Sequence, residues 1–170
     1  MMTKMADHAP TSAALAAEIE RMLGEHAIAA LYRASVRPLR TRRFQLNAPP
    51  QPVPVDVQHT LLGIELKIGK RRLQCPDVAT ARFLAVFARL GVAEVAVPYD
   101  ITRMGALADA LEAAWFRLTA AVEAATAGRS NRLRARVLAL LCAEQRRLIA
   151  ELGAGADVPQ FNQNTKQRKR

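Results

Sequence analysis

Apolar positions along the chain repeat with a helical period near both ends and alternate with polar ones in the middle. The first periodic stretch predicts an amphipathic helix that begins at Thr11 or Ser12 and continues to about residue 35. Gly24 interrupts this helix and favours a bend or a break there. The predicted apolar stripe contains Leu15, Ile19, Met22, Leu23 and Leu31.

Strict alternation between residues 60 and 75 predicts a β-hairpin. A turn at Gly69-Lys70 would pair Ile68 with Arg71 and Leu66 with Leu73. One face then points to the core and contains Leu62, Ile64, Leu66, Ile68, Leu73 and Cys75. The other face contains Glu65, Lys67, Arg72 and Gln74.

A helix and a buried strand should follow this hairpin. Asp77 is a good N-cap for a helix over residues 78–90, and Gly91 is a good left-handed C-cap. The nearly apolar run 94–98 then predicts a buried strand. A hairpin, a crossover helix and a returning strand together predict a mixed sheet covered by helices.

Two long helices should complete the fold. The first begins near Asp100 or Thr102 and the second at Ser130 or Asn131, with a turn at 127–129 that predicts an antiparallel helical hairpin. Their predicted buried positions are Met104, Leu107, Leu111, Leu118, Val122, Leu133, Val137, Leu140, Leu141 and Leu148. The predicted fold is α/β (α+β), with a small mixed sheet, a packed helix and this helical hairpin.

Length and composition predict one α/β domain over residues 11–152, a disordered N-terminus over 1–10 and a disordered basic tail over 153–170. The chain is 51% hydrophobic but only 5% aromatic, so its core should consist mainly of Ala, Leu and Val. No apolar run is long enough to span a membrane and no apolar leader begins the chain. We therefore expect a soluble, cytoplasmic protein with no membrane partner.

The net charge of +10 favours a polyanionic partner such as DNA, RNA or an anionic membrane surface, although a basic surface without a dedicated partner stays open. Arginines crowd residues 33–43, where there is no acid, and a short strand near 42–46 leads into a proline-rich connector or edge strand over 47–55. The candidate nucleic-acid-binding residues are Arg37, Arg40, Arg42, Arg43, Lys70, Arg71, Arg72, Lys166, Arg168, Lys169 and Arg170. A further basic stripe on the last helix contains Arg129, Arg132, Arg136 and Arg147. It is either a solvated face or a surface that lies along a nucleic-acid backbone.

Glu65 and Lys67 form an E-x-K pattern on one strand, so both side chains leave the same face. A carboxylate in that position can hold Mg²⁺ while the ammonium stabilises phosphate charge. The run IELKIGKRRLQCPD, the helix through FLAVFARLG, the strand EVAVPYD and the helix ALADALEAAW resemble the PD-(D/E)xK nuclease superfamily, in particular its VRR-type and Holliday-junction-resolvase-like members.

This resemblance covers about residues 60–115 and implies a metal-dependent phosphodiesterase. It implies that Asp56 and Glu65 would be the Mg²⁺ ligands, and that Lys67 would complete the catalytic set. If the chain turned back near residues 58–60, Asp56 would pair near Leu62. Without that activity, no cofactor is expected.

Two functional hypotheses stay open. The first is a nucleic-acid-associated protein, whose sharper form is the Mg²⁺-dependent nuclease. The second is a non-enzymatic interaction protein that forms homo-oligomers or docks through its C-terminal helices, with incidental basic charge. Trp115 is interpreted as a core or interface residue rather than a base-stacking one, and Cys75 and Cys142 as free thiols.

Overall fold

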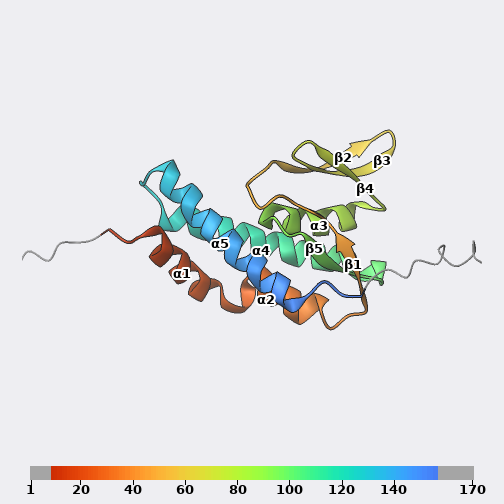
Figure 1. The fold of residues 1–170 in the computed structure, drawn as a ribbon, viewed down its shortest axis with the longest axis horizontal. Coiled ribbons are helices and arrows are strands. Elements are labelled where there is room, and N and C mark those ends of the chain that lie inside the picture. Colours follow the sequence, from red (N-terminus) through yellow and green to blue (C-terminus); the bar gives the residue numbers. More distant parts are fainter. Residues whose placement is uncertain (1–8, 157–170) are drawn as a thin grey trace, which may run out of the picture.

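The computed structural model describes residues 9–156, and Figure 1 shows their arrangement. Its helical elements are α1 (Ser12–Leu23), η1 (Gly24–His26), α2 (Ile28–Leu31), η2 (Tyr32–Val36), α3 (Val78–Leu90), η3 (Ile101–Arg103), α4 (Met104–Ala125) and α5 (Asn131–Leu152). Its strands are β1 (Thr41–Gln45), β2 (Val55–Thr60), β3 (Gly63–Ile68), β4 (Arg71–Cys75) and β5 (Glu94–Pro98). The α+β class predicted from the sequence is confirmed.

The strands form two antiparallel sheets, so the expectation of one mixed sheet is wrong in this respect. β2, β3 and β4 form a three-stranded sheet, while β5 pairs with β1. Leu46 and Asn47 both donate their backbone N–H to the Ala93 carbonyl at 2.8 Å, which closes the β1–β5 pair. The proline-rich segment that follows cannot donate regularly to a ladder, so the chain leaves this sheet before it begins the next.

The main core surrounds α3, which begins and ends where the sequence predicts. The Asp77 side chain accepts the Thr80 N–H at 2.7 Å, and Gly91 ends the helix with φ +78°. α3 packs on the three-stranded sheet and against α4 and α5, and it is buried on nearly every side. A helix with so many apolar positions needs several packing partners to remove its surface from water.

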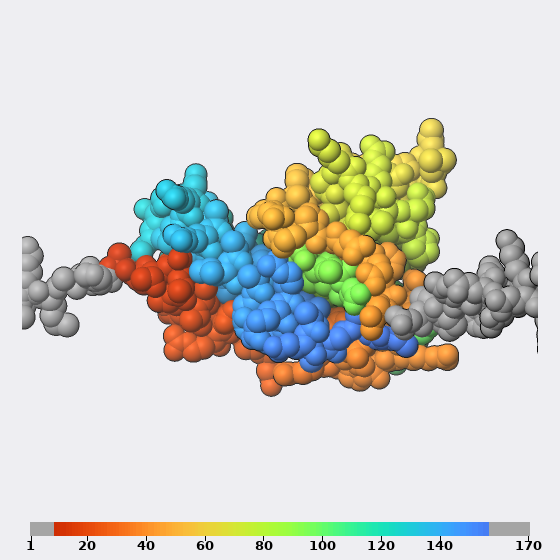
Figure 2. All heavy atoms as spheres, viewed as in Figure 1, coloured from red at the N-terminus to blue at the C-terminus, as the bar shows by residue number. Residues whose placement is uncertain are grey.

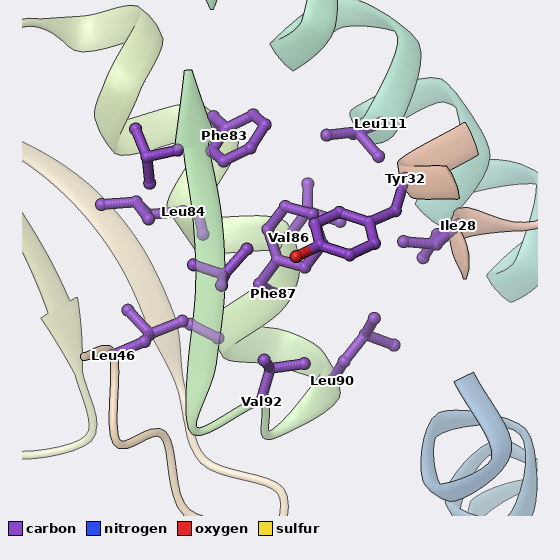
Figure 3. Packing of buried hydrophobic residues seen from close by; sticks show 14 of the residues in the cluster. Ile28, Tyr32, Leu46, Phe83, Leu84, Val86, Phe87, Leu90, Val92 and Leu111 are labelled. Carbon is purple, nitrogen blue, oxygen red and sulfur yellow. The ribbon is translucent and has the colours of Figure 1, made fainter. Parts of the chain in front are cut away.

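Tyr32 joins three parts of this core (Figure 3). Its ring meets Phe87 edge-on at 5.5 Å between centroids. Its hydroxyl donates to the Gly153 carbonyl at 2.5 Å and accepts the Ala96 N–H at 3.0 Å. The phenol therefore ties η2 to β5 and to the segment after α5. Burial raises the pKa of this phenol above its ordinary value.

The predicted break in the N-terminal helix is confirmed at Gly24, where φ is +48°. The chain restarts at α2, where the buried Gln145 side chain accepts the Ala29 N–H at 2.8 Å. Met22 was expected to be buried but is 68% exposed. The buried stripe runs through residues four apart, Leu15, Ile19 and Leu23, and Met22 lies beside it.

α4 and α5 run in opposite directions and are joined by a short turn, as predicted (Figure 1). Ser130 caps α5 by accepting the Leu133 N–H at 3.2 Å. Leu140 was expected to be buried, but it is 40% exposed because it lies about 100° around the helix from Leu141. No helix in residues 9–156 is long and apolar enough to cross a membrane.

The chain stays packed against the domain beyond residue 152, where the sequence predicted its end. Ala154 is buried, and Arg43 donates its backbone N–H to the Ala156 carbonyl at 2.6 Å. Residues 153–156 therefore do not belong to a free tail. The rest of the predicted basic tail, 157–170, and residues 1–8 of the predicted N-terminal segment lie outside the described residues.

Candidate functional site

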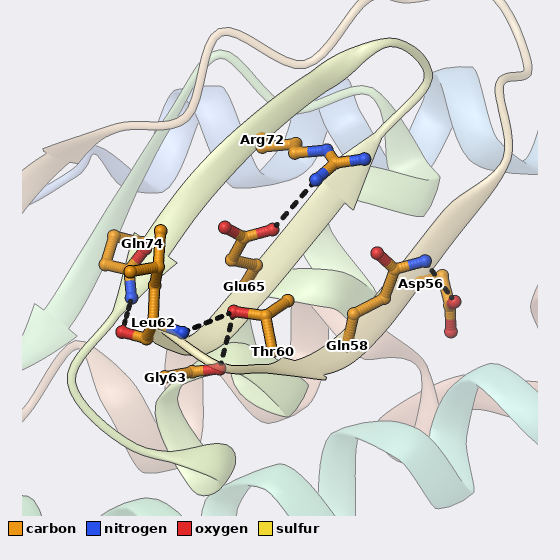
Figure 4. A network of polar contacts seen from close by, with 8 residues as sticks. All are labelled: Asp56, Gln58, Thr60, Leu62, Gly63, Glu65, Arg72 and Gln74. Carbon is orange, nitrogen blue, oxygen red and sulfur yellow. Dashed lines mark hydrogen bonds and ion pairs between the residues drawn. The ribbon is translucent and has the colours of Figure 1, made fainter.

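The E-x-K pattern lies on the central strand of the three-stranded sheet (Figure 4). The β3–β4 pairing confirms the predicted register, with Ile68 opposite Arg71 and Glu65 opposite Gln74. Gly69 occupies the turn with φ +59°, a conformation that glycine adopts at little cost.

The β2–β3 turn lies later in the chain than expected. Thr60 pairs with Gly63, so the turn falls at Leu61-Leu62 rather than at 58–60. The Thr60 hydroxyl accepts the Leu62 N–H and donates to the Gly63 carbonyl, both at 3.2 Å. Leu62 is consequently 83% exposed and is not a core residue.

This turn changes the register that was expected for Asp56. Asp56 lies opposite Lys67, and Gln58 lies opposite Glu65; Asp56 does not pair with Leu62. Asp56, Glu65 and Lys67 therefore share one face of the sheet. Asp56 is exposed and its Oδ2 accepts a hydrogen bond from Gln58 Nε2 at 3.2 Å.

Glu65 is a buried carboxylate with few partners. Its side chain is only 10% exposed, and its Oε2 lies 3.6 Å from Arg72 Nη1. That separation permits Coulomb attraction but is too long for a hydrogen bond, and Oε2 has no hydrogen-bond partner while being shielded from solvent.

The donors nearest to Glu65 along the two neighbouring strands are directed elsewhere. Gln58 donates to Asp56, and Gln74 Nε2 donates to the Leu62 carbonyl at 2.8 Å. Figure 4 shows these side chains turned away from the carboxylate. The Oε2 atom of Glu65 is therefore buried without a hydrogen-bond donor.

The Mg²⁺ site implied by the resemblance requires Asp56 and Glu65 to share one ion. Gln58 instead lies between them and is bonded to Asp56, while Arg72 approaches Glu65 (Figure 4). Among residues 9–156, no group of three or more His, Cys, Asp or Glu side chains could hold a metal ion. Each of the two carboxylates is thus engaged by another side chain, and the Mg²⁺ site that would use them with Lys67 stays a prediction.

Four of the candidate nucleic-acid-binding arginines have partners within the protein. Arg43 Nη1 lies 3.4 Å from Glu94 Oε2, and Arg71 donates to the Leu46 carbonyl. Arg40 lies over the Tyr99 ring at 5.2 Å, and Arg42 over the Phe44 ring at 5.9 Å. These contacts limit the reach of the four side chains toward a phosphate.

The other candidates differ in exposure. Arg37 is half-buried beside the end of α5. Its Nη2 lies 3.7 Å from the point that a Cβ would occupy if Gly153 had a side chain. Lys70 is exposed at the β3–β4 turn, and the Arg72 side chain is 59% exposed. The remaining candidates, Lys166, Arg168, Lys169 and Arg170, lie outside the described residues.

The basic stripe on α5 divides into paired and unpaired members. Arg147 is bonded to Glu144 and Glu151. Arg129, Arg132 and Arg136 are exposed and have no acidic partner in the described part of the chain.

A groove of about 280 Å³ lies between α5 and the connector that joins β1 to β2, and Figure 2 shows the hollow beside the cyan-to-blue α5. Its lining residues are Pro50, Pro52, Val53, Arg89, Leu90, Trp115, Ala135, Leu138, Ala139 and Cys142. The sequence interpretation missed this groove.

Basic residues border both sides of this groove. Gly69 donates its N–H to the Pro54 carbonyl at 2.8 Å, so the turn with Lys70 abuts the connector. The opposite wall contains Ala135 and Ala139 of α5. Arg132 precedes them by three and seven residues, so it lies on the same face of the helix. Helical spacing in the sequence could have predicted that these α5 residues share one face. No local pattern predicts that this face lies opposite the connector.

Comparison with known protein families, characterised proteins and solved structures finds no match to this chain.

Proposed function

We propose that this protein associates with nucleic acid, DNA or RNA, through contacts to the phosphate backbone. The observation that carries the proposal is the pair of exposed basic elements that flank one groove: the β3–β4 turn with Lys70, and the α5 face with Arg132. Phosphates spaced along a strand can contact both elements at once, and release of their counterions then favours binding.

The charges of these residues are available to a partner. Lys70 and Arg132 are exposed and form no ion pair with an acidic side chain among residues 9–156. Arg72 adds a largely exposed guanidinium whose one contact with a carboxylate, at 3.6 Å, is long. The overall charge of +10 supplies a field of the same sign around them.

The proposed activity is association rather than cleavage. Asp56 accepts a hydrogen bond from Gln58, and Glu65 lies beside Arg72. The magnesium-dependent nuclease implied by the resemblance stays a prediction without support from these contacts.

Charge reversal tests the proposal. We expect Lys70→Glu and Arg132→Glu each to weaken binding of a labelled nucleic acid by about fivefold or more, because each removes a phosphate contact and adds repulsion. Fluorescence anisotropy at low salt measures the affinity. Arg21→Glu is the matched control, since Arg21 is exposed on α1 and the charge change is identical.

The control should change the affinity by less than about twofold. Equal weakening by all three substitutions would mean that only net charge matters, and would contradict an interface at the groove.

A further inference from the structure

The groove between α5 and the connector combines an apolar floor with cationic edges. Trp115 and Leu90 lie at its lining, together with Leu138 from α5. Burial raises the pKa of the Cys142 thiol to about 11, so this side chain is neutral at physiological pH and adds to the apolar lining. Such a surface favours a flat, weakly hydrated group.

Three basic residues lie in the lining of the groove or next to it. Arg89 lines it from the last turn of α3, is half-buried and has no acidic partner among the described residues. Arg132 lies three residues before the lining residue Ala135 on α5. Lys70 follows Gly69, which donates its N–H to the connector at Pro54. The charge pattern therefore favours an anionic ligand.

The walls of the groove are held in position before any ligand arrives. Arg146 donates to the Leu90 carbonyl at 3.1 Å and to the Pro50 carbonyl at 3.4 Å, which joins α5 to both α3 and the connector. The prolines restrict the connector backbone further. A preformed site loses less conformational entropy on binding.

We infer that this groove binds single-stranded nucleic acid, with an unstacked base against Trp115 and the flanking phosphates near Arg89, Arg132 and Lys70. The inference rests on the proposed nucleic-acid association and specifies its substrate class. Only a single strand presents an aromatic base face and a phosphate at the same place, since a duplex keeps its base faces stacked inside. Stacking on Trp115 and the Arg89 charge would then act together.

Trp115 provides a direct measurement because it is the only tryptophan of the chain. We expect its fluorescence to be quenched when the full chain is titrated at low salt with an oligo(dT) strand of about 16 nucleotides. A duplex of the same length should bind through its phosphates without this quenching. Equal quenching by the duplex would overturn the inference.

A blocking variant identifies the groove independently of the tryptophan. Ala135→Glu places a carboxylate on the groove wall at an exposed helical position, which is compatible with folding. It should weaken oligo(dT) binding by about tenfold or more and abolish the quenching. Ala120→Glu, an exposed position on α4 outside the groove lining, is the matched control and should leave both unchanged.

The outcomes separate this inference from the broader proposal. Salt-dependent binding without quenching, and with Ala135→Glu equal to Ala120→Glu, would overturn the groove site while leaving nucleic-acid association intact. Quenching by a poly-glutamate peptide that matches oligo(dT) would assign the groove to acidic protein segments instead. Absence of any binding at low salt would overturn both.

Discussion

Glu65 is a carboxylate that the fold shields from water without giving its Oε2 a hydrogen-bond donor. Removing an ionised group from water costs free energy, and a partner 3.6 Å away that is itself largely exposed returns little of that cost. Burial without a hydrogen-bond donor is a cost to the folded state that a neutral side chain would not carry.

We therefore expect Glu65→Gln to raise the free energy of unfolding by about 1 kcal/mol, because the neutral amide is less costly to bury. Urea unfolding measures this change. Asp56→Asn is the control on the same face; Asp56 is exposed, so its effect should stay within about 0.5 kcal/mol. A loss of stability in Glu65→Gln would show that the ionised carboxylate is needed by the folded protein.

Magnesium adds a second readout to the same pair of variants. Because Asp56 accepts a hydrogen bond from Gln58 and Glu65 lies beside Arg72, about 10 mM Mg²⁺ should leave the unfolding midpoint of the wild type and of Glu65→Gln equally unaffected. Stabilisation of the wild type that is lost in Glu65→Gln would contradict this geometry and favour the nuclease hypothesis.

Tyr32 is a single residue on which two distant segments depend. Tyr32→Phe leaves the Ala96 N–H and the Gly153 carbonyl without their partner, so we expect a loss of about 1–3 kcal/mol in the free energy of unfolding. Urea unfolding again measures it. Tyr99→Phe is the matched control: Tyr99 is 45% exposed, and its loss should stay below about 0.5 kcal/mol. Equal effects of the two substitutions would contradict the bridging role of the Tyr32 hydroxyl.

At the scale of elements, Gly91 determines how the end of α3 meets the connector. A Cβ at this position would lie 2.8 Å from the Pro49 carbonyl oxygen and 2.9 Å from the Pro50 Cα. Both neighbours are backbone atoms, and the φ of +78° is strained for any residue with a side chain. The close approach also sets the connector wall of the groove.

Gly91→Ala should therefore destabilise the protein by about 1–3 kcal/mol, measured by thermal or urea unfolding. Gly105→Ala is the control, because Gly105 is helical and a Cβ there would meet nothing within 4 Å. The control should be neutral or stabilising by up to about 1 kcal/mol. Similar behaviour of the two variants would contradict the close contact at Gly91.

Elements were predictable from the sequence where their signals are local. Asp77 and Gly91 correctly predicted the two ends of α3. The Gly69-Lys70 turn correctly predicted the β3–β4 register. The β2–β3 turn was misplaced because Leu61 and Leu62 do not have the composition of a turn. Alternation also cannot say which strands pair, so two antiparallel sheets were not distinguished from one mixed sheet.

At the scale of the whole molecule, the candidate interface arises from segments that are distant in sequence. The connector, the end of α3, Trp115 and the α5 wall meet only in the folded chain. The E-x-K pattern was visible in the sequence, but the burial of Glu65 and the separation of Asp56 from it depend on the register of a neighbouring strand. Homo-oligomerisation through the C-terminal helices stays a prediction.

The central claim is that basic residues on both sides of the groove bind the phosphates of one nucleic acid. Its most direct test is the dependence of the affinity on salt, compared between the wild type and the double variant Lys70→Glu/Arg132→Glu. Each lost phosphate contact should lower the slope of log K against log salt by about 0.7–0.9, so we predict a slope smaller by about 1.5 in the double variant. Equal slopes, or no measurable wild-type binding at about 50 mM salt, would contradict the account.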